Sequence, residues 1–197
     1  LLPYRSNTSN EQWFDQRLNQ YKQVVLVTQG TVEKDVTKII VPTLEAFKQT
    51  DTLVVVTTGG SQTNELRASY PYSNIIIEDF VAFDDIMPYA DVYVTNGGYG
   101  GVMLSIENKL PMVTAGVHEG KNEICARVGY FELGINLKTE TPSASQIKKA
   151  VQQVIDDTPY RENTERLAQY SPAAIPAVAP ASCKRATSIG PRRKSGN

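Results

Sequence analysis

The chain has few of the residues that build metal sites and disulfide frameworks. Its 197 residues include one histidine, His118, and two cysteines, Cys125 and Cys183. A single histidine excludes a histidine-rich metal centre. The two cysteines lie far apart and lack metal-ligand spacing, which is typical of reduced thiols in a cytosolic protein. We therefore expect a cytoplasmic protein without a bound metal or other cofactor.

Long apolar runs and the common phosphate-binding signatures are also absent. No apolar run approaches the roughly 18 residues of a membrane-spanning helix, and the first residues lack a signal-peptide pattern. No Gly-Lys-Ser/Thr run supports a P-loop. The dinucleotide fingerprint needs a third glycine after the first strand, whereas Met103 stands at the corresponding place and follows a late strand. Both of these nucleotide-binding classes are excluded.

The net charge of −1 conceals an uneven distribution of charge. Residues 184–197 contain five basic residues and no acidic one, whereas the rest of the chain has 15 basic and 21 acidic residues. Nucleic-acid binding requires a basic face, so we expect no nucleic-acid partner. Residues 171–197 are first rich in proline and alanine and then basic, which is typical of a disordered tail.

Between residues 23 and 170, short apolar runs alternate with helical patterns. The runs lie at 24–27, 53–56, 75–77, 91–94, 112–114 and 135–137. Continuous apolar runs indicate strands that are covered on both faces, and their alternation with helices indicates βαβ units. We expect a Rossmann-like three-layer α/β/α domain with a six-stranded parallel sheet in the order 3-2-1-4-5-6. Residues 1–22 are polar and are expected to form an interdomain linker.

The intervening helices are less sharply defined by the sequence. We expect helices at 35–48, 84–89, after the glycines near 100, at 122–131, from Ser143 onward, and at 160–170. Residues 61–73 are polar and show no clear pattern. Residues 11–21 are expected to form a short helix within the linker.

Four glycines occupy five positions between the fourth strand and its following helix: Gly97, Gly98, Gly100 and Gly101. The first N–H groups of a helix lack intrahelical partners and lie at the positive end of its dipole. Such an end binds phosphate or pyrophosphate. Alternatively, the glycines only permit close packing of helix on strand.

A second glycine-bearing loop follows the first strand and contains Gly30 and Thr31. In the expected strand order, the first and fourth strands are neighbours, and ligands bind where the strand order reverses. The two loops should therefore converge at one binding site.

Several motifs in order resemble the nucleotide-sugar half of UDP-glycosyltransferases of the GT-B fold, especially bacterial macrolide-type members. The resemblance covers about residues 1–170. It rests on FVAF at 80–83, TNGGYGG at 95–101, Leu-Pro at 110–111, Glu-Gly-Lys at 119–121, VTQGT at 27–31 and Leu-Pro at 2–3.

The resemblance implies roles for residues on the nucleotide side of the site. Phe80 stands where the family stacks an aromatic ring on uracil, and the Val81 backbone would pair with the base edge. Asn96 replaces the phosphate-contacting histidine. Gly100 and Gly101 replace Asn and Ser, so backbone amides would be the donors to pyrophosphate, and Thr31 would bind near the β-phosphate from the other loop.

The resemblance also shows departures on the sugar side. Leu104 stands where many members carry an acid that binds the ribose hydroxyls. Gly120 and Lys121 stand where the family has the Asp-Gln pair that reads the sugar hydroxyls; Glu119 would substitute for the acid, and Lys121 would contact a phosphate or an acidic sugar. Each assignment has a structural alternative: Phe80 and Phe83 as core aromatics, His118 as a loop histidine, and Glu119 with Lys121 as a solvated helix start.

The implied function is donor binding in an inverting transfer of a hexose from a UDP-sugar to an acceptor hydroxyl. The family's catalytic base is a histidine of the N-terminal acceptor-binding domain, so no catalytic residue is expected here and the chain alone should be inactive. No Asp-x-Asp motif occurs, so we expect metal-independent binding. The alternatives are a subunit of a split two-chain transferase and a UDP-sugar epimerase-type protein. The residues expected to bind the donor are Gly30, Thr31, Phe80, Val81, Phe83, Asn96, Gly97, Gly98, Gly100, Gly101, Glu119 and Lys121.

Overall fold

The structure is a computed structural model that describes residues 12–170. Its centre is a six-stranded sheet in which all neighbouring strands are parallel. The strand order is β3-β2-β1-β4-β5-β6, which confirms the predicted order. The strands are β1 (Gln23–Thr28), β2 (Thr52–Thr57), β3 (Ile75–Glu78), β4 (Val92–Thr95), β5 (Met112–Thr114) and β6 (Gly134–Asn136).

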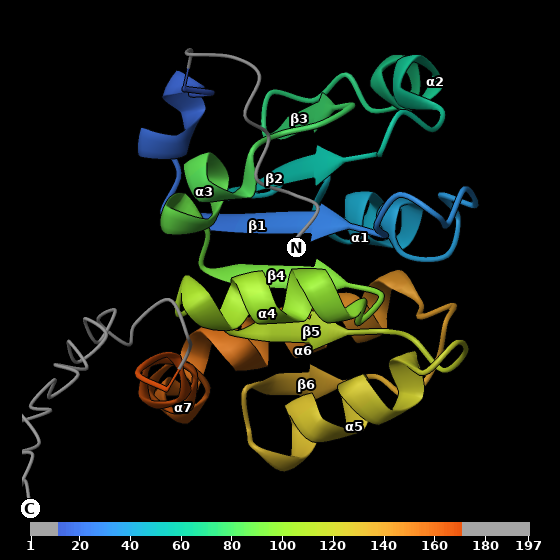
Figure 1. Ribbon diagram of the computed structural model, residues 1–197. Helices are drawn as coiled ribbons and strands as arrows, with labels where there is room; N and C mark the ends of the chain where they lie inside the picture. Colours follow the sequence, from blue (N-terminus) through green and yellow to red (C-terminus); the bar gives the residue numbers. More distant parts are fainter. Residues whose placement is uncertain (1–11, 171–197) are drawn as a thin grey trace, which may run out of the picture.

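Helices cover both faces of this sheet and make three layers (Figure 1). They are α1 (Ile40–Phe47), α2 (Thr63–Ser69), α3 (Phe83–Ile86), α4 (Tyr99–Glu107), α5 (Lys121–Tyr130), α6 (Ala144–Asp156) and α7 (Thr158–Ala168), with 3-10 turns η1 (Gln16–Asn19) and η2 (Met87–Tyr89). The predicted three-layer α/β/α fold is confirmed.

The apolar runs of the strands supply two separate cores because alternate side chains point to opposite faces. Val25 and Val27 of β1 pack in a core with α1 and α6. Val24 and Leu26 pack in the other core, with α3 and α4. Consecutive positions in the middle of these strands are therefore apolar, which explains why the runs are continuous and not alternating.

Three helices differ from the sequence prediction. The short helix expected at 11–21 is, within the described residues, only the four-residue 3-10 turn η1. Helix α2 (Thr63–Ser69) lies in the segment that shows no clear pattern, because only Thr63 and Leu66 of its side chains are buried. Helix α1 begins at Ile40 and not at Asp35, whose carboxylate instead accepts hydrogen bonds from the N–H and hydroxyl of Thr37. Pro42 occupies the third position of α1, where its missing N–H breaks no intrahelical bond.

Residues 12–22, which precede β1, pack on the domain. The N–H of Trp13 donates to Asp85 at 2.9 Å, and Leu18 is buried. Arg17 donates to the carbonyls of Ser73 and Ile75, at 3.3 and 3.1 Å. Strand β3 is an edge strand, so the Arg17 guanidinium covers backbone groups that would otherwise face outward.

Candidate functional site

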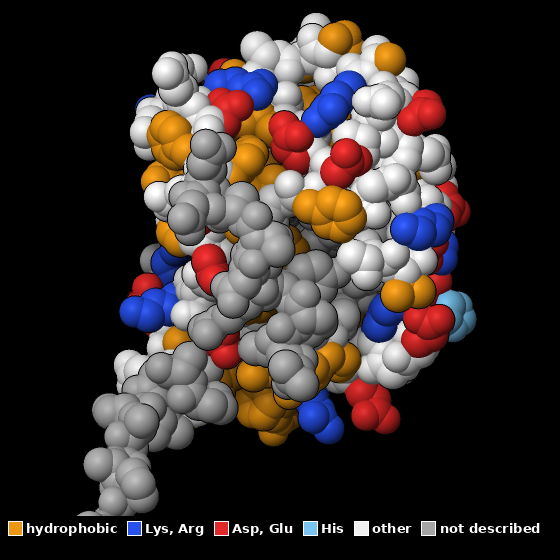
Figure 2. All heavy atoms as spheres, turned by 45° about the horizontal axis from the view of Figure 1, so that its top comes forward, with side chains coloured by type: hydrophobic (Ala, Val, Ile, Leu, Met, Phe, Trp, Pro, Cys, Tyr) orange, Lys and Arg blue, Asp and Glu red, His pale blue; other side chains and the backbone are white. Residues whose placement is uncertain are grey.

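The candidate site lies at the carboxyl edge of the sheet, where the loops after the six strands are gathered. Acidic and basic side chains are interspersed over the visible part of the face that Figure 2 shows. Between residues 12 and 170, no group of three or more His, Cys, Asp or Glu side chains has the arrangement of a metal site. No helix in the same part of the chain is long and apolar enough to cross a membrane.

Helix α4 begins at this edge with an open N-terminus. Gly98 is its N-cap, and no side chain caps the helix. The first intrahelical bond runs from the N–H of Val102 to the carbonyl of Gly98 at 3.1 Å. The N–H groups of Tyr99, Gly100 and Gly101 precede that bond and are available to an anion at the positive end of the helix dipole.

The glycines of this loop are there for different reasons. Gly97 has a φ of +76°, and a Cβ there would overlap the sulfur of buried Cys125. A Cβ at Gly101 would lie 2.8 Å from the Tyr93 hydroxyl. Close packing therefore accounts for these two glycines. A Cβ at Gly100 meets nothing within 4 Å, so packing does not account for Gly100.

Asn96 joins the loops after β1 and β4. Its side-chain N–H donates to the carbonyl of Gln29, and its side-chain oxygen accepts from the N–H of Gly98 at 3.1 Å. The loop after β5 also packs closely against Asn96, because a Cβ at Gly116 would overlap the Asn96 carbonyl. The amide thus fixes the N-cap of α4, a role that its type allows because it both donates and accepts.

Gln29 holds the β1 loop from inside the domain, and the sequence did not single out its side chain. That side chain is buried; its oxygen accepts from the N–H groups of Ile39 and Ile40 at 2.8 and 3.1 Å, and its nitrogen donates to the Asp35 carbonyl. The first N–H groups of α1 are therefore occupied by protein. Of the two helices next to the paired loops, α4 is the one whose N-terminus stays open.

Gly30 and Thr31 lie where the loops after β1 and β2 meet. Gly30 has a φ of +78°, and a Cβ at Gly59 would lie 3.2 Å from the Gly30 carbonyl and 3.4 Å from the Thr31 Cα. A Cβ at Gly30 would lie 3.9 Å from the Asn96 side-chain nitrogen. The two glycine-bearing loops converge as the strand order predicts.

The aromatic residues at 80 and 83 separate into one surface ring and one core ring. Phe80 is 63% exposed, and its ring edge lies 3.8 Å from where a Cβ at Gly60 would stand. Phe83 is 8% exposed and packs edge-on against Tyr93 with ring centres 6.1 Å apart. Val81 is also buried. Phe80 is therefore free to stack on a ligand, whereas Phe83 belongs to the core.

The residues at 118–121 form a tight turn at the start of α5. The N–H of Lys121 donates to the His118 carbonyl at 3.0 Å, and the φ values of Glu119 and Gly120 are +56° and +78°. Two consecutive positive φ values are those of a type I′ turn. Lys121 donates to Glu119 at 2.9 Å, so this pair is mutually neutralised in the structure.

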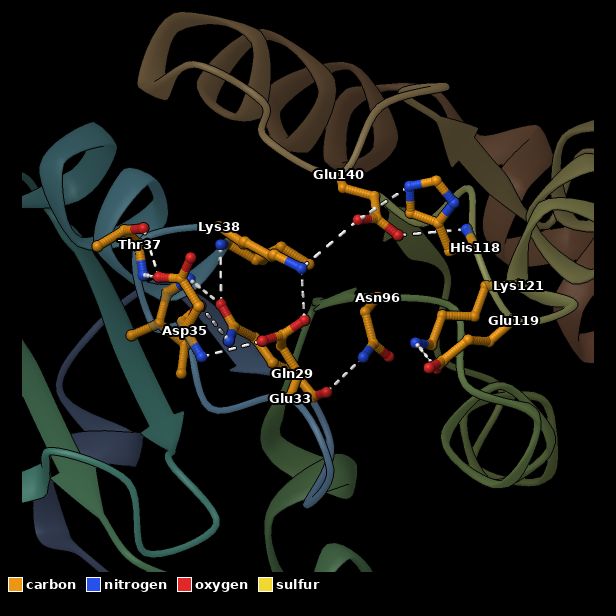
Figure 3. A network of polar contacts seen from close by, with 12 residues as sticks. Gln29, Glu33, Asp35, Thr37, Lys38, Asn96, His118, Glu119, Lys121 and Glu140 are labelled. Atoms are coloured by element: carbon orange, nitrogen blue, oxygen red, sulfur yellow. Dashed lines mark hydrogen bonds and ion pairs between the residues drawn. The ribbon is translucent and has the colours of Figure 1, made fainter.

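A network of charged groups connects this turn to the β1 loop (Figure 3). Lys38 lies 2.6 Å from Glu33 and 3.5 Å from Glu140, which follows β6. Glu140 accepts from the N–H of His118 at 3.2 Å, and its carboxylate lies 3.7 Å from the His118 ring nitrogen. Burial alone would raise the pKa of Glu140, but His118 and Lys38 hold it below its ordinary value.

The same groups enclose a small cavity beside Asn96. Its lining includes Glu33, Lys38, Asn96, Lys121 and Glu140. A hydrogen bond to Glu33 is the largest influence on Lys38 and raises its pKa, so Lys38 stays charged. Every ammonium in this lining is paired with a carboxylate of the chain.

Residues 42–181 match the protein family described as "Erythromycin biosynthesis protein CIII-like, C-terminal domain". The chain belongs to this family. Two relatives agree with the assignment. "UDP-glucosyltransferase 1" of Beauveria bassiana is 38% identical over 151 residues, which cover 76% of this chain and 33% of that protein. "4'-demethylrebeccamycin synthase" of Lentzea aerocolonigenes is 37% identical over 150 residues, covering 76% and 35% of the two chains.

The fold of this EryCIII-like C-terminal domain is also that of solved glycosyltransferases. The crystal structure of the kitacinnamycin glycotransferase superposes with a TM-score of 0.69 at 19% identity, covering 81% of this chain and 41% of that one. The chain spans about a third of the length of the two relatives above. The predicted family is thus confirmed: the chain is an EryCIII-like C-terminal domain, and the relatives and solved structures that it matches are glycosyltransferases.

In this EryCIII-like domain, one departure from the family pattern is explained by packing. Leu104 is 6% exposed and contributes to the core between α4 and the sheet. A buried leucine offers no hydrogen bond to a ribose hydroxyl. Lys38 and Glu140 were not among the expected site residues, since neither belongs to a local motif; only the fold brings them beside Asn96 and the 118–121 turn.

Proposed function

We propose that this domain binds the UDP-sugar donor of an inverting hexosyltransferase, and that the acceptor site and catalytic base belong to an N-terminal domain. The observation that carries the proposal is the open N-terminus of α4 beside the Gly30–Thr31 loop, on the same edge of the sheet as the exposed Phe80 ring. The name of the Beauveria bassiana relative supports uridine as the base.

In the proposed arrangement, the pyrophosphate lies over the N–H groups of Tyr99, Gly100 and Gly101. Charge-assisted bonds to three backbone amides contribute roughly 5–9 kcal/mol before the costs of association. Thr31 is exposed and approaches from the β1 loop. When the bond from sugar to UDP breaks, negative charge develops on the leaving phosphate, and these donors together with the helix dipole stabilise it.

The base is proposed to stack on Phe80. Base stacking on an aromatic ring contributes about 1–3 kcal/mol, which corresponds to a loss of roughly 5- to 150-fold in affinity when the ring is removed. Because Phe80 is mostly exposed, its removal should have little effect on stability. The sugar is proposed to lie beside Glu119 and Lys121, at the turn that starts α5.

The test is calorimetric titration of the chain with UDP, UMP, ADP and GDP, with and without Mg²⁺. The amides of α4 provide phosphate contacts without a metal ion, so we expect UDP to bind with a micromolar to millimolar Kd in EDTA as well. Phe80→Ala should weaken UDP binding as stated above. Gly100→Val should weaken it at least tenfold, because the new side chain occupies the free space above the amides.

Gly129→Ala is the matched control, since Gly129 is also a helical glycine and a Cβ there would meet only the Asn136 Cβ at 3.6 Å. It should leave UDP affinity within about twofold of the starting chain. If none of the four nucleotides bound, the proposal would be refuted. Equal affinity for UDP and ADP would refute the uridine preference.

A further inference from the structure

Glu140 contacts two loops that the proposed donor site uses, although it lies outside every motif of that site. It follows β6, and its side chain is 19% exposed. One carboxylate oxygen accepts from the backbone N–H of His118, at the first residue of the 118–121 turn. The other oxygen lies 3.5 Å from Lys38, whose ammonium also pairs with Glu33 of the β1 loop (Figure 3).

Apart from Glu140, the turn is held by bonds within itself and by its continuation into α5. Glu119 adopts a φ of +56°, which is unfavourable for a residue with a side chain. The turn has one internal backbone bond, from Lys121 to His118. Glu119 is 71% exposed and its carboxylate contacts Lys121 of the same turn. The bond from His118 to Glu140 therefore ties the turn to the rest of the domain.

We propose that Glu140 is a positioning residue: it fixes the 118–121 turn against the β1 loop, and discrimination among donor sugars depends on it. This inference rests on the proposed function. The nucleotide contacts come from α4, Thr31 and Phe80, none of which Glu140 touches. Loss of the carboxylate should therefore leave UDP affinity nearly unchanged and should alter the relative affinities for different UDP-sugars.

The experiment measures Kd for UDP, UDP-glucose, UDP-N-acetylglucosamine and UDP-glucuronic acid with the full chain and with two variants. Glu140→Ala removes both contacts. Glu140→Gln keeps an oxygen that can accept from the His118 N–H but removes the charge that faces Lys38. For both variants we expect UDP affinity within about twofold of the starting chain. The spread, defined as the ratio of the weakest to the tightest Kd among the three UDP-sugars, should shrink at least fivefold in Glu140→Ala. In Glu140→Gln it should be partly restored.

Glu45→Gln is the control, because Glu45 lies on α1, away from the turn, and forms an ion pair of 2.7 Å with Lys48, the residue after the helix. It should change neither UDP affinity nor the spread among sugars. Thermal unfolding of all variants checks folding, and Glu140→Gln carries the test if Glu140→Ala fails to fold.

Three results would overturn the inference while leaving UDP binding established. The first is a starting chain that binds all three sugars alike. The second is a Glu140 variant that loses UDP and every UDP-sugar in equal proportion. The third is a variant with an unchanged spread among the sugars. Failure of UDP itself to bind would instead refute the proposed function, and this inference with it.

Discussion

Gly97 is the position where the loop after β4 has least freedom, and replacing it by alanine tests the loop geometry directly. Its φ of +76° lies in the left-handed region, which costs alanine about 1–2 kcal/mol. The new methyl group would also overlap the sulfur of Cys125, which is fully buried. Overpacking of this kind costs about 1–3 kcal/mol. Gly97→Ala should therefore destabilise the domain by roughly 2–5 kcal/mol.

The two contributions can be separated with Cys125→Ala. Removing the buried sulfur alone should cost about 1 kcal/mol of stability. In the double variant the overlap is gone, and only the left-handed backbone and the lost sulfur remain. The double variant should thus be more stable than the sum of the single changes predicts, by roughly 1–3 kcal/mol, the range of coupling between residues in contact.

The measurement is urea unfolding at 25 °C, followed by circular dichroism and analysed with a common m-value. Gly100→Ala is the matched control, because a Cβ there meets nothing and the helix gains up to about 1 kcal/mol from alanine. Equal stabilities of Gly97→Ala and Gly100→Ala would refute the argument. Strict additivity of Gly97→Ala and Cys125→Ala would show that the methyl and the sulfur do not meet.

Three further predictions concern the scaffold. Phe83→Ala should cost about 3–5 kcal/mol in urea unfolding because the ring is buried against Tyr93; a loss below 1 kcal/mol would contradict its place in the core. Ser143→Ala should lower the free energy of unfolding by about 1 kcal/mol, because Ser143 is the N-cap residue of a capping box with Gln146. The backbone amides in the first turn of α6 should also exchange with solvent faster in hydrogen exchange, and unchanged exchange rates would contradict this role. A hydrogen bond from Arg17 lowers the pKa of Asp15, so the stability that this pair contributes is present above about pH 4 and is lost as the pH falls through the lowered pKa. Asp15→Asn should therefore be less stable at pH 7 by roughly 0.2–1 kcal/mol, and the difference should shrink as the pH is lowered below 4. A difference that stays constant as the pH falls would refute the pairing.

The sheet could be predicted from the sequence because its strands are buried on both faces. Every residue of β2 is buried, and its four central residues, 53–56, are all apolar, as a strand covered on both faces requires. Helix α2 could not be predicted for the complementary reason: it buries Leu66 and Thr63 only, which leaves no apolar stripe to read. The sequence prediction began α1 too early, at residue 35. The side chain that binds the first N–H groups of this helix is Gln29, which follows β1 and lies ten and eleven residues before the residues it contacts.

The sequence could predict where the candidate site lies, but not the role of each residue in it. The two glycine-bearing loops follow neighbouring strands, so their convergence follows from strand order alone. Side chains from elsewhere in the chain, such as Cys125 and Tyr93, determine which glycines are needed for close packing and which have free space beside them. The pairing of Glu140 with Lys38 joins loops about a hundred residues apart, and no local pattern contains it.

The strand order also divides the sheet into two halves. Strands β3, β2 and β1 come from residues 23–78, and β4, β5 and β6 from residues 92–136, so each half of the sheet is contiguous in the chain. Within the sheet, the halves meet where β1 pairs with β4, in a register that joins Val25 to Val92; outside the sheet, Lys38 pairs with Glu140 across the same division. Such distant pairing is slow to form, because a long loop must close first. The bond from Asn96 to Gln29 spans this junction, so the proposed nucleotide would bind across it and, by binding only the folded domain, would stabilise the pairing of the two halves.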